Sequence, residues 1–248
     1  MTPIQQMLLG VGAKKKIYSD EVFSTYLWKG DDGSNRHIDN GIDINGEGGM
    51  VWVYKREGGA YGSTYVGDTA RGLGKQLFTG SSDGESNVNR IKPTSGSNTG
   101  FNVNNDSDVN SSSNTYASWT FRKAKGFFDV VTYTGNGTAG HTINHSLGCV
   151  PGCILIKSRE SSNTQAWQVY HRNLSPAGTS EGDAIFLNLL NSSQTGSQFW
   201  NNAAPTATQF TLGTDQMNNG NGNTYVAYLF AGGESPAATA RSVDFNGS

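Results

Sequence analysis

The amino-acid sequence predicts an all-β protein made of two tandem repeated β-sandwich or jelly-roll-like modules, preceded by a short N-terminal anchoring segment. Three observations support this fold class. Glycine accounts for 33 of the 248 residues, and Asn, Ser and Thr are also frequent, as is typical of short strands joined by tight turns. No long stretch has the periodicity of an amphipathic helix. Three blocks of sequence recur in the same order at nearly constant spacing, which indicates an array of structural modules.

The N-terminal segment, residues 1–20, has no counterpart in the repeat. Ile4, Met7, Leu8 and Leu9 make it apolar, and one or two helical turns are expected before the glycines that follow. So short a helix is not stable alone in water. We therefore expect these four side chains to dock on another protein chain, which makes the segment an anchor.

The duplication is visible in three pairs of corresponding segments. They are NTYASWTF (114–121) with NTYVAYLF (223–230), GMVWV (49–53) with GCILI (152–156), and Phe23, Gly30 and Ile38 with Phe128, Gly135 and Ile143. The second pair is followed in both copies by an Arg-Glu dipeptide, at 56–57 and at 159–160. We assign the first module to 21–125 and the second to 126–231. The connector is so short that the modules are expected to pack together.

Alternation along the strand at 50–54 predicts its buried face. Val51 and Val53 correspond to Ile154 and Ile156, so β-branched residues occupy one face in both copies, as in a half-buried strand. The other face differs between the copies. Trp52 and Tyr54 stand there in the first, and Leu155 and Lys157 in the second. We interpret that face as exposed.

The repeated strand near the end of each module has two aromatic residues on one face. These are Trp119 and Phe121 in the first copy, and Tyr228 and Phe230 in the second. Buried aromatic side chains contribute roughly 1.5–3 kcal/mol each. We expect this face to supply the main core contribution of each module.

The last segment, 232–248, has the composition of a linker up to about residue 240. The closing residues 242–248 then have the pattern of a new strand. We interpret the segment as a linker and the start of a further domain, as in a longer protein.

Bulk charge argues against several classes of partner. The net charge is −2, the pI is near 6.1, and the only basic cluster, Lys14 to Lys16, is short, so nucleic-acid binding receives little support. No run approaches the roughly 20 apolar residues of a membrane span, and the first residues do not have the pattern of a secretory signal. A soluble protein without membrane insertion is expected.

Catalytic and metal-binding patterns are weak throughout the sequence. No nucleophile elbow, phosphate-binding loop or Cys–His constellation occurs. His141, His145 and His171 are too few for a closed metal site. Asp106 and Asp108 resemble the start of a calcium loop that later positions do not continue, so a plain Asx turn is favoured over a looser calcium site. We expect no enzyme activity, no catalytic residues, no cofactor and no metal.

Aromatic side chains offer one alternative. Trp52, Tyr61, Trp167 and Trp200, if exposed, could stack on sugar rings, and binding residues often lie on the loops of rigid sandwiches. These four are the candidate glycan-contact residues.

Four segments resemble a repeat module of tail-fibre and other virion proteins of marine tailed phages, especially cyanophages. The segments are MTPIQQMLLG (1–10), YASWTFRKA (116–124), GFFDVVTYTGNGT (126–138) and TYVAYLFA (224–231). The closing SVDFNGS (242–248) looks like the first strand of a concanavalin A-like or laminin-G-like sandwich, with which longer members continue. The family brings no catalytic residues, so none is transferred.

The resemblance implies a virion structural protein, the virion-proximal part of a tail fibre, made in the host cytoplasm and located on the phage tail or neck. It implies a homotrimer that contacts other virion proteins of the tail, adaptor or nozzle and supports host attachment. Three readings stay open: a fibre of the head or neck, a carbohydrate-binding sandwich that itself recognises a host surface glycan, and a polysaccharide-degrading enzyme, which would need a carboxylate pair that the sequence does not offer.

Overall fold

The computed structural model describes residues 17–57, 64–160, 162, 164–174 and 180–232. Regular structure in this part of the chain is almost entirely β, arranged in four antiparallel sheets, and the all-β prediction is confirmed. Four single-turn α-helices and one 3-10 turn join the strands. They are α2 (Ser19–Val22), α3 (Ile44–Glu47), η1 (Ser180–Gly182), α4 (Ser197–Trp200) and α5 (Gln216–Asn219).

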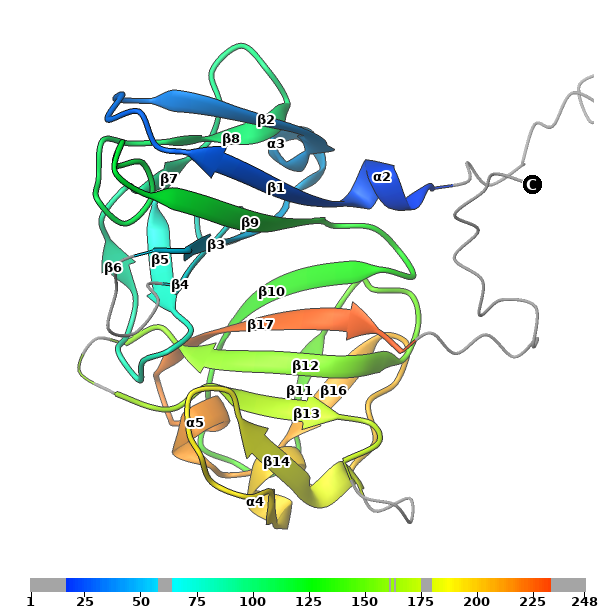
Figure 1. Ribbon diagram of the computed structural model, residues 1–248. Helices are drawn as coiled ribbons and strands as arrows, with labels where there is room; N and C mark the ends of the chain where they lie inside the picture. Colours follow the sequence, from blue (N-terminus) through cyan, green and yellow to red (C-terminus); the bar gives the residue numbers. More distant parts are fainter. Residues whose placement is uncertain (1–16, 58–63, 161, 163, 175–179, 233–248) are drawn as a thin grey trace, which may run out of the picture.

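Each repeat forms one six-stranded sheet and one smaller sheet (Figure 1). The first repeat contains β1 (Phe23–Lys29), β2 (Arg36–Asp43), β3 (Gly49–Lys55), β4 (Thr64–Asp68), β5 (Lys75–Phe78), β6 (Ser86–Asn87), β7 (Ile91–Lys92), β8 (Thr99–Val103) and β9 (Thr115–Arg122). The second contains β10 (Phe128–Thr134), β11 (His141–Asn144), β12 (Pro151–Ser158), β13 (Gln168–His171), β14 (Asp183–Phe186), β15 (Gln194–Thr195), β16 (Gln209–Leu212) and β17 (Thr224–Ala231).

The two large sheets have the same strand order. The first is β1-β9-β3-β4-β5-β6, and the second is β10-β17-β12-β13-β14-β15, in which each strand corresponds to the one at the same place in the first. The repeated strands β9 and β17 lie second from the edge, between the first strand of their repeat and the strand that carries the Val or Ile pair. The sequence duplication is therefore a duplication of sheet topology.

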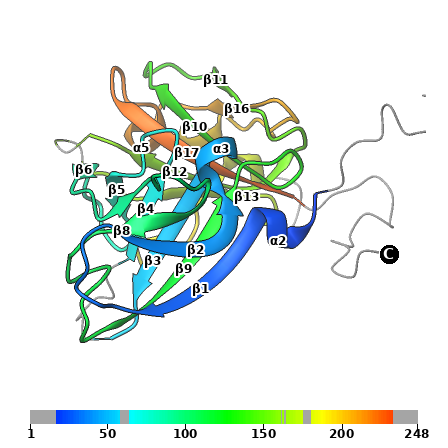
Figure 2. The same ribbon diagram turned by 90° about the horizontal axis from the view of Figure 1, so that it is seen from above.

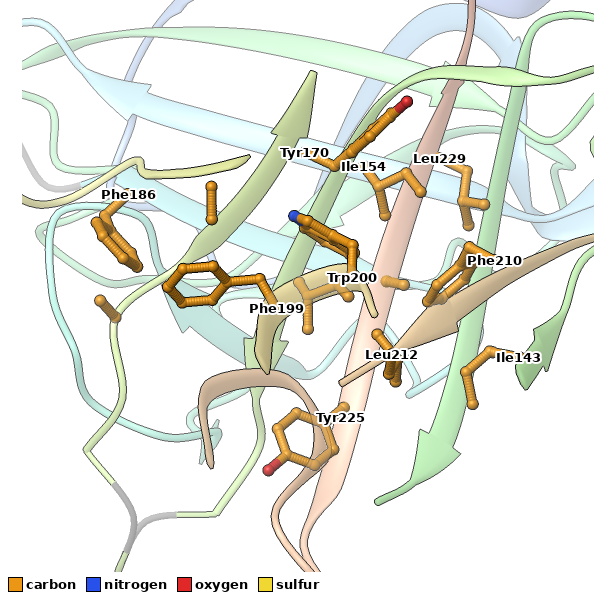
Figure 3. Close-up of a cluster of buried hydrophobic side chains, with 14 of the residues drawn as sticks. Ile143, Ile154, Tyr170, Phe186, Phe199, Trp200, Phe210, Leu212, Tyr225 and Leu229 are labelled. Atoms are coloured by element: carbon orange, nitrogen blue, oxygen red, sulfur yellow. The ribbon is translucent and has the colours of Figure 1, made fainter. Parts of the chain in front are cut away.

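A small sheet covers the outer face of each large sheet. In the first repeat it is β2-β8-β7, and in the second it is β11-β16, assisted by α4 and α5. Val51 and Val53 lie fully buried beneath the first small sheet, and Ile154 and Ile156 lie fully buried beneath the second, so this part of the predicted core is confirmed. Figure 3 shows the second of these cores, in which residues from β11, β12, β16 and β17 converge on Trp200.

The inner faces of the two large sheets pack against each other and form a third core. Met50 and Leu77 from the first repeat meet Leu155, Trp167 and other residues from the second. The interpretation of the variable strand face as exposed is therefore wrong. It is the face through which the repeats contact each other, and it differs between copies because the surfaces that meet there are different.

The repeated aromatics also lie at this contact and not inside each module. Tyr228 belongs to the inter-repeat core, and Phe121 and Phe230 pack against it. The residues of β9 and β17 that enter the module cores are their neighbours in the strand, which face the small sheets. These are Tyr116 in the first repeat, and Tyr225, Ala227 and Leu229 in the second.

The repeated glycines mark places where two loops touch. A Cβ at Gly30 would collide with the backbone of Asn110 and Ser111, and one at Gly135 would collide with the backbone of Asn219 and Gly220. Only glycine lets the turn after β1, or after β10, lie against the loop that precedes the repeated strand.

The chain enters and leaves the described part of the molecule at the same corner. In Figures 1 and 2, α2 at the start of β1 and the end of β17 lie close together, and the two strands diverge from there. The connector from β9 to β10 also lies at this corner, where β10 contacts β3 and β9. Among the described residues no helix is long and apolar enough to cross a lipid bilayer.

Candidate functional site at the interface between the repeats

Four phenylalanines join the repeats at the corner where the chain passes from one to the other. Phe23 and Phe121 lie on paired strands with ring centroids 4.9 Å apart, and the corresponding Phe128 and Phe230 are 5.1 Å apart. The two pairs meet through Phe121 and Phe230, at 5.4 Å and nearly perpendicular. Edge-to-face packing of this kind adds about 0.5–1.5 kcal/mol per pair to the burial of area. Corresponding residues of the two copies therefore contact each other directly.

A charged cluster lies deeper in the same interface. The guanidinium of Arg71, after β4, pairs with Asp68 (2.5 Å) and with Glu85 (3.1 Å), and it donates a hydrogen bond to the Tyr228 hydroxyl of the second repeat (3.0 Å). That hydroxyl donates to Asp68 (2.7 Å). The side chains of Asp68 and Arg71 have no exposed surface. The second repeat thus completes an ion pair that belongs to the first.

Glu85 makes the second connection between the repeats. Its carboxylate accepts hydrogen bonds from Arg159 (3.0 and 3.3 Å), and its amide donates to the carbonyl of Arg159 (2.9 Å). Burial alone would raise the pKa of Glu85, but the hydrogen bonds and charges of Arg159 and Arg71 outweigh it, so this pKa lies below its ordinary value. Burial holds the pKa of Tyr228 well above its ordinary value, so its hydroxyl keeps its proton.

A buried ion pair is weak evidence for high stability, but it can favour one position of the two repeats relative to each other. Desolvation offsets much of the attraction, yet removing one partner costs about 3–5 kcal/mol because the other charge is left uncompensated. The cluster therefore penalises any shift of one repeat against the other. Its contacts therefore hold the two large sheets in one relative position.

Lys157 is a further buried charge that the sequence pattern placed on an exposed face. It is fully buried, and its ammonium donates to the carbonyl oxygens of Ser82 (3.0 Å) in the first repeat and Ser158 (3.1 Å) in the second. Burial lowers its pKa to about 8. The alternation of residue types along one strand does not predict that a lysine is buried, because the sheet that covers it comes from another part of the chain.

The candidate glycan-contact residues do not form a platform. Trp167 is only 1% exposed and donates from its indole to the carbonyl of Phe78 across the interface (2.7 Å). Trp200 is also 1% exposed and donates to the carbonyl of Asp183 inside the second core (2.9 Å; Figure 3). The assignment of these two to sugar contacts is wrong, because neither ring face reaches solvent. Trp52 is half-buried, and Tyr61 lies outside the described residues.

Trp52 packs edge-to-face on Trp119 of the neighbouring strand, with centroids 6.2 Å apart. Both are half-buried members of the inner face of the first sheet.

The four residues predicted to anchor the chain, Ile4, Met7, Leu8 and Leu9, lie outside the described residues.

The acidic turn considered for calcium is an Asx turn that both repeats use. The Asp106 carboxylate accepts from the amide of Asp108 (2.8 Å), and it also pairs with Arg90 (3.0 Å). In the second repeat the carboxylate of Asp215 accepts in the same way from the amide of Met217 (2.7 Å). The favoured Asx-turn interpretation is confirmed.

A fully buried asparagine, Asn110 or Asn219, stands four residues after the aspartate that opens each turn, Asp106 or Asp215. The Asn219 amide donates to the carbonyls of Thr138 (2.9 Å) and Gly213 (2.6 Å), and its oxygen accepts from the amide of Asn136 (3.0 Å). This pair was not predicted, although the spacing between the repeated strands 114–121 and 223–230 relates Asn110 to Asn219.

The repeated Arg-Glu dipeptide also has a structural role. Glu57 accepts a hydrogen bond from the Thr115 hydroxyl (3.0 Å), and Glu160 accepts one from the Thr224 hydroxyl (2.7 Å). These threonines begin β9 and β17. In both repeats the glutamate therefore holds the start of the repeated strand.

The histidines and cysteines are dispersed. His141 bonds Asn219 (2.9 Å), His145 is buried and His171 is exposed. Cys149 and Cys153 are free thiols that pack against different cores. Within the described ranges, no three His, Cys, Asp or Glu side chains gather as metal ligands would.

The model of a family described as a domain of unknown function (DUF7483) matches residues 18–237, which include both large sheets and the interface between them. A search of curated proteins gave no match.

Proposed function

This chain belongs to the DUF7483 family of domains of unknown function, and we propose that it is a structural protein of a phage virion. In this proposal it forms the virion-proximal part of a tail fibre, attaches to the tail or neck through residues 1–20, and supports host adsorption. The observation that carries the proposal is the buried, charged interface that holds the two repeats in one position relative to each other.

The interface suits a structural protein whose two modules must keep a fixed position relative to each other. Arg71, Glu85 and Arg159 connect the repeats through charges with little or no exposed surface, and the phenylalanine corner packs beside them. Hinged domains instead meet through small and polar interfaces. A stiff double module is what a support needs.

The path of the chain supports attachment from one side. The two ends of the described structure, before α2 and after β17, lie at one corner of the molecule (Figure 1). The turns that carry Asn110 and Asn219 lie at the opposite ends of β1 and β10. An anchoring segment at the corner would leave those turns directed away from the anchor.

The carbohydrate-binding alternative loses two of its residues to the cores. Trp167 and Trp200 are buried, and stacking on a sugar needs an accessible ring face. The structural proposal does not depend on these residues.

Virion composition tests the proposal. An antibody raised against the purified chain should label the tail or neck in electron micrographs of virions of the phage that encodes it. A chain that lacks residues 1–12 should fold but be missing from virions, whereas a chain that lacks residues 237–248 should still be incorporated. Absence of the intact protein from virions would refute the proposal, labelling of the capsid would move the fibre to the head, and incorporation of the N-terminal deletion would remove the anchor.

A further inference from the structure

Strand β1 is an unpaired sheet edge. It hydrogen-bonds to β9 on one side, through seven consecutive residue pairs without a bulge, and no strand of the described structure pairs with its other side. Figure 2 shows β1 at the outer margin of the molecule. The Lys29 carbonyl at the end of the strand accepts a hydrogen bond from Arg36 (2.6 Å). The other backbone N–H and C=O groups that point away from β9 can template another strand.

Apolar exposure is concentrated on and beside this edge. Nine large hydrophobic side chains of the described residues are exposed, and four of them, Ile17, Tyr18, Tyr26 and Leu27, fall within eleven positions. Leu27 is 65% exposed in the middle of the molecule's first strand. Three others, Leu187, Leu189 and Leu190, lie after β14 and outside any strand, so they do not accompany a free edge.

The other edge strands of the two large sheets, β6, β10 and β15, differ from β1. Edge strands are usually short, charged, bulged or covered, which prevents pairing between molecules. β6 and β15 have two residues each. β10 buries its first three residues, and those that it exposes are Thr132 and Thr134. β1 has seven residues, no proline, and its one charge, Lys29, at the last position.

We propose that β1 pairs in antiparallel orientation with β1 of a second copy of this chain, about a two-fold axis near Tyr26, so that the two first sheets become continuous. Charge favours this partner. Each β1 has acidic residues, Asp20 and Glu21, in the turn that precedes it, and Lys29 at its end. The antiparallel arrangement brings Lys29 of each copy toward Asp20 and Glu21 of the other copy.

The pairing also covers the exposed side chains. Leu27 of one copy comes opposite Thr25 of the other on the same face of the sheet, and both are exposed in the single chain. Cross-strand pairs of this kind contribute about 0.2–1 kcal/mol each. The inference rests on the edge strand alone and does not depend on the proposed virion function.

Light scattering coupled to size-exclusion chromatography tests the pairing with the full chain. The wild type should be a dimer at micromolar concentration. Leu27→Lys should raise the dissociation constant about tenfold or more, since it introduces a charge on each strand at the pairing. Leu190→Lys is the matched control, the same change at a leucine that is fully exposed away from β1, and it should remain dimeric.

A cysteine variant tests the register independently of stability. Directly opposed residues of antiparallel strands have Cα atoms about 4.5–5.5 Å apart, within reach of a disulfide. Tyr26→Cys should therefore form a covalent dimer under mild oxidation, and Leu190→Cys should not. A monomeric wild type, an oligomer that Leu27→Lys leaves unchanged, or equal cross-linking of the two cysteine variants would overturn the proposal.

Discussion

Asn110 and Asn219 show how single residues determine the loops of this fold. Each is fully buried and follows an Asx turn. The side-chain amide of each donates hydrogen bonds to groups of a neighbouring loop. The loop after β1 or β10 is tied to the loop before β9 or β17 in this way. Buried polar groups cost little when every donor and acceptor is satisfied, and they are expensive when one is not.

Asn219→Ala should destabilise the protein by about 3 kcal/mol, since it leaves the carbonyls of Thr138 and Gly213 and the amide of Asn136 without partners, and each such group costs roughly 1–3 kcal/mol. The free energy of unfolding in urea measures the effect. Asn221→Ala, at an exposed position of the same loop, is the control and should change stability by less than about 0.5 kcal/mol. Equal losses in the two variants would contradict the role given to Asn219.

At the scale of the element, β12 shows why one strand can be misinterpreted. Ile154 and Ile156 face the small sheet of their own repeat, and Leu155 and Lys157 face the other repeat. Both faces are buried, but the alternation of residue types resembles a half-exposed strand. Lys157 is tolerated because two backbone carbonyls receive its ammonium.

The pH dependence of stability should report on Lys157. Its pKa of about 8 in the folded state lies below the 10.5 of an ordinary lysine, so above pH 8 the unfolded chain binds more protons, and stability from this residue rises with pH. Between pH 7 and about 9.5, before tyrosines ionise, the gain should be about 1–2 kcal/mol relative to Lys157→Met. Denaturant unfolding of both proteins measures it. Parallel pH profiles would show that the buried ammonium is not destabilised.

The whole molecule consists of two sandwiches joined through their large sheets. The chain makes four layers, small sheet, large sheet, large sheet, small sheet, with one core in each of the three spaces between them. The middle space contains an ion pair whose two side chains have no exposed surface. Arg71, Asp68 and Glu85 come from the first repeat, and Tyr228 and Arg159 come from the second.

We expect the two repeats to unfold as one cooperative unit in calorimetry, with equal calorimetric and van't Hoff enthalpies. Tyr228→Phe removes the hydroxyl that bonds both Arg71 and Asp68 and should lower stability by about 1.5–3 kcal/mol, as hydrogen bonds to charged groups do. Combined with Glu85→Gln, it should broaden the transition or split it in two. Tyr54→Phe, which removes a hydroxyl outside this cluster and away from β1, is the control. Two separate transitions in the wild type would show that the interface does not couple the repeats.

Much of the fold could be predicted from local pattern. The all-β class followed from glycine-rich turns and short alternating runs, and Val51, Val53, Ile154 and Ile156 were placed correctly because alternation reports which residues share a face. The Asx turn at Asp106 was recognisable because its hydrogen bond spans two residues. The contacts of Glu85 with Arg159 and of Asp68 with Tyr228 span 74 and 160 positions, and no local pattern specifies them.

By itself, the sequence determined the strands, their alternation, the turns and the existence of two equivalent units, because these depend on backbone geometry and on neighbours a few residues away. Only the tertiary structure decided which faces meet. It turned the variable face of β3 and β12 into an interior, buried Lys157 and Trp167, and left β1 as the uncovered edge. The physical reason is that burial depends on what lies across a sheet, and here a second, non-identical copy of the same unit lies there.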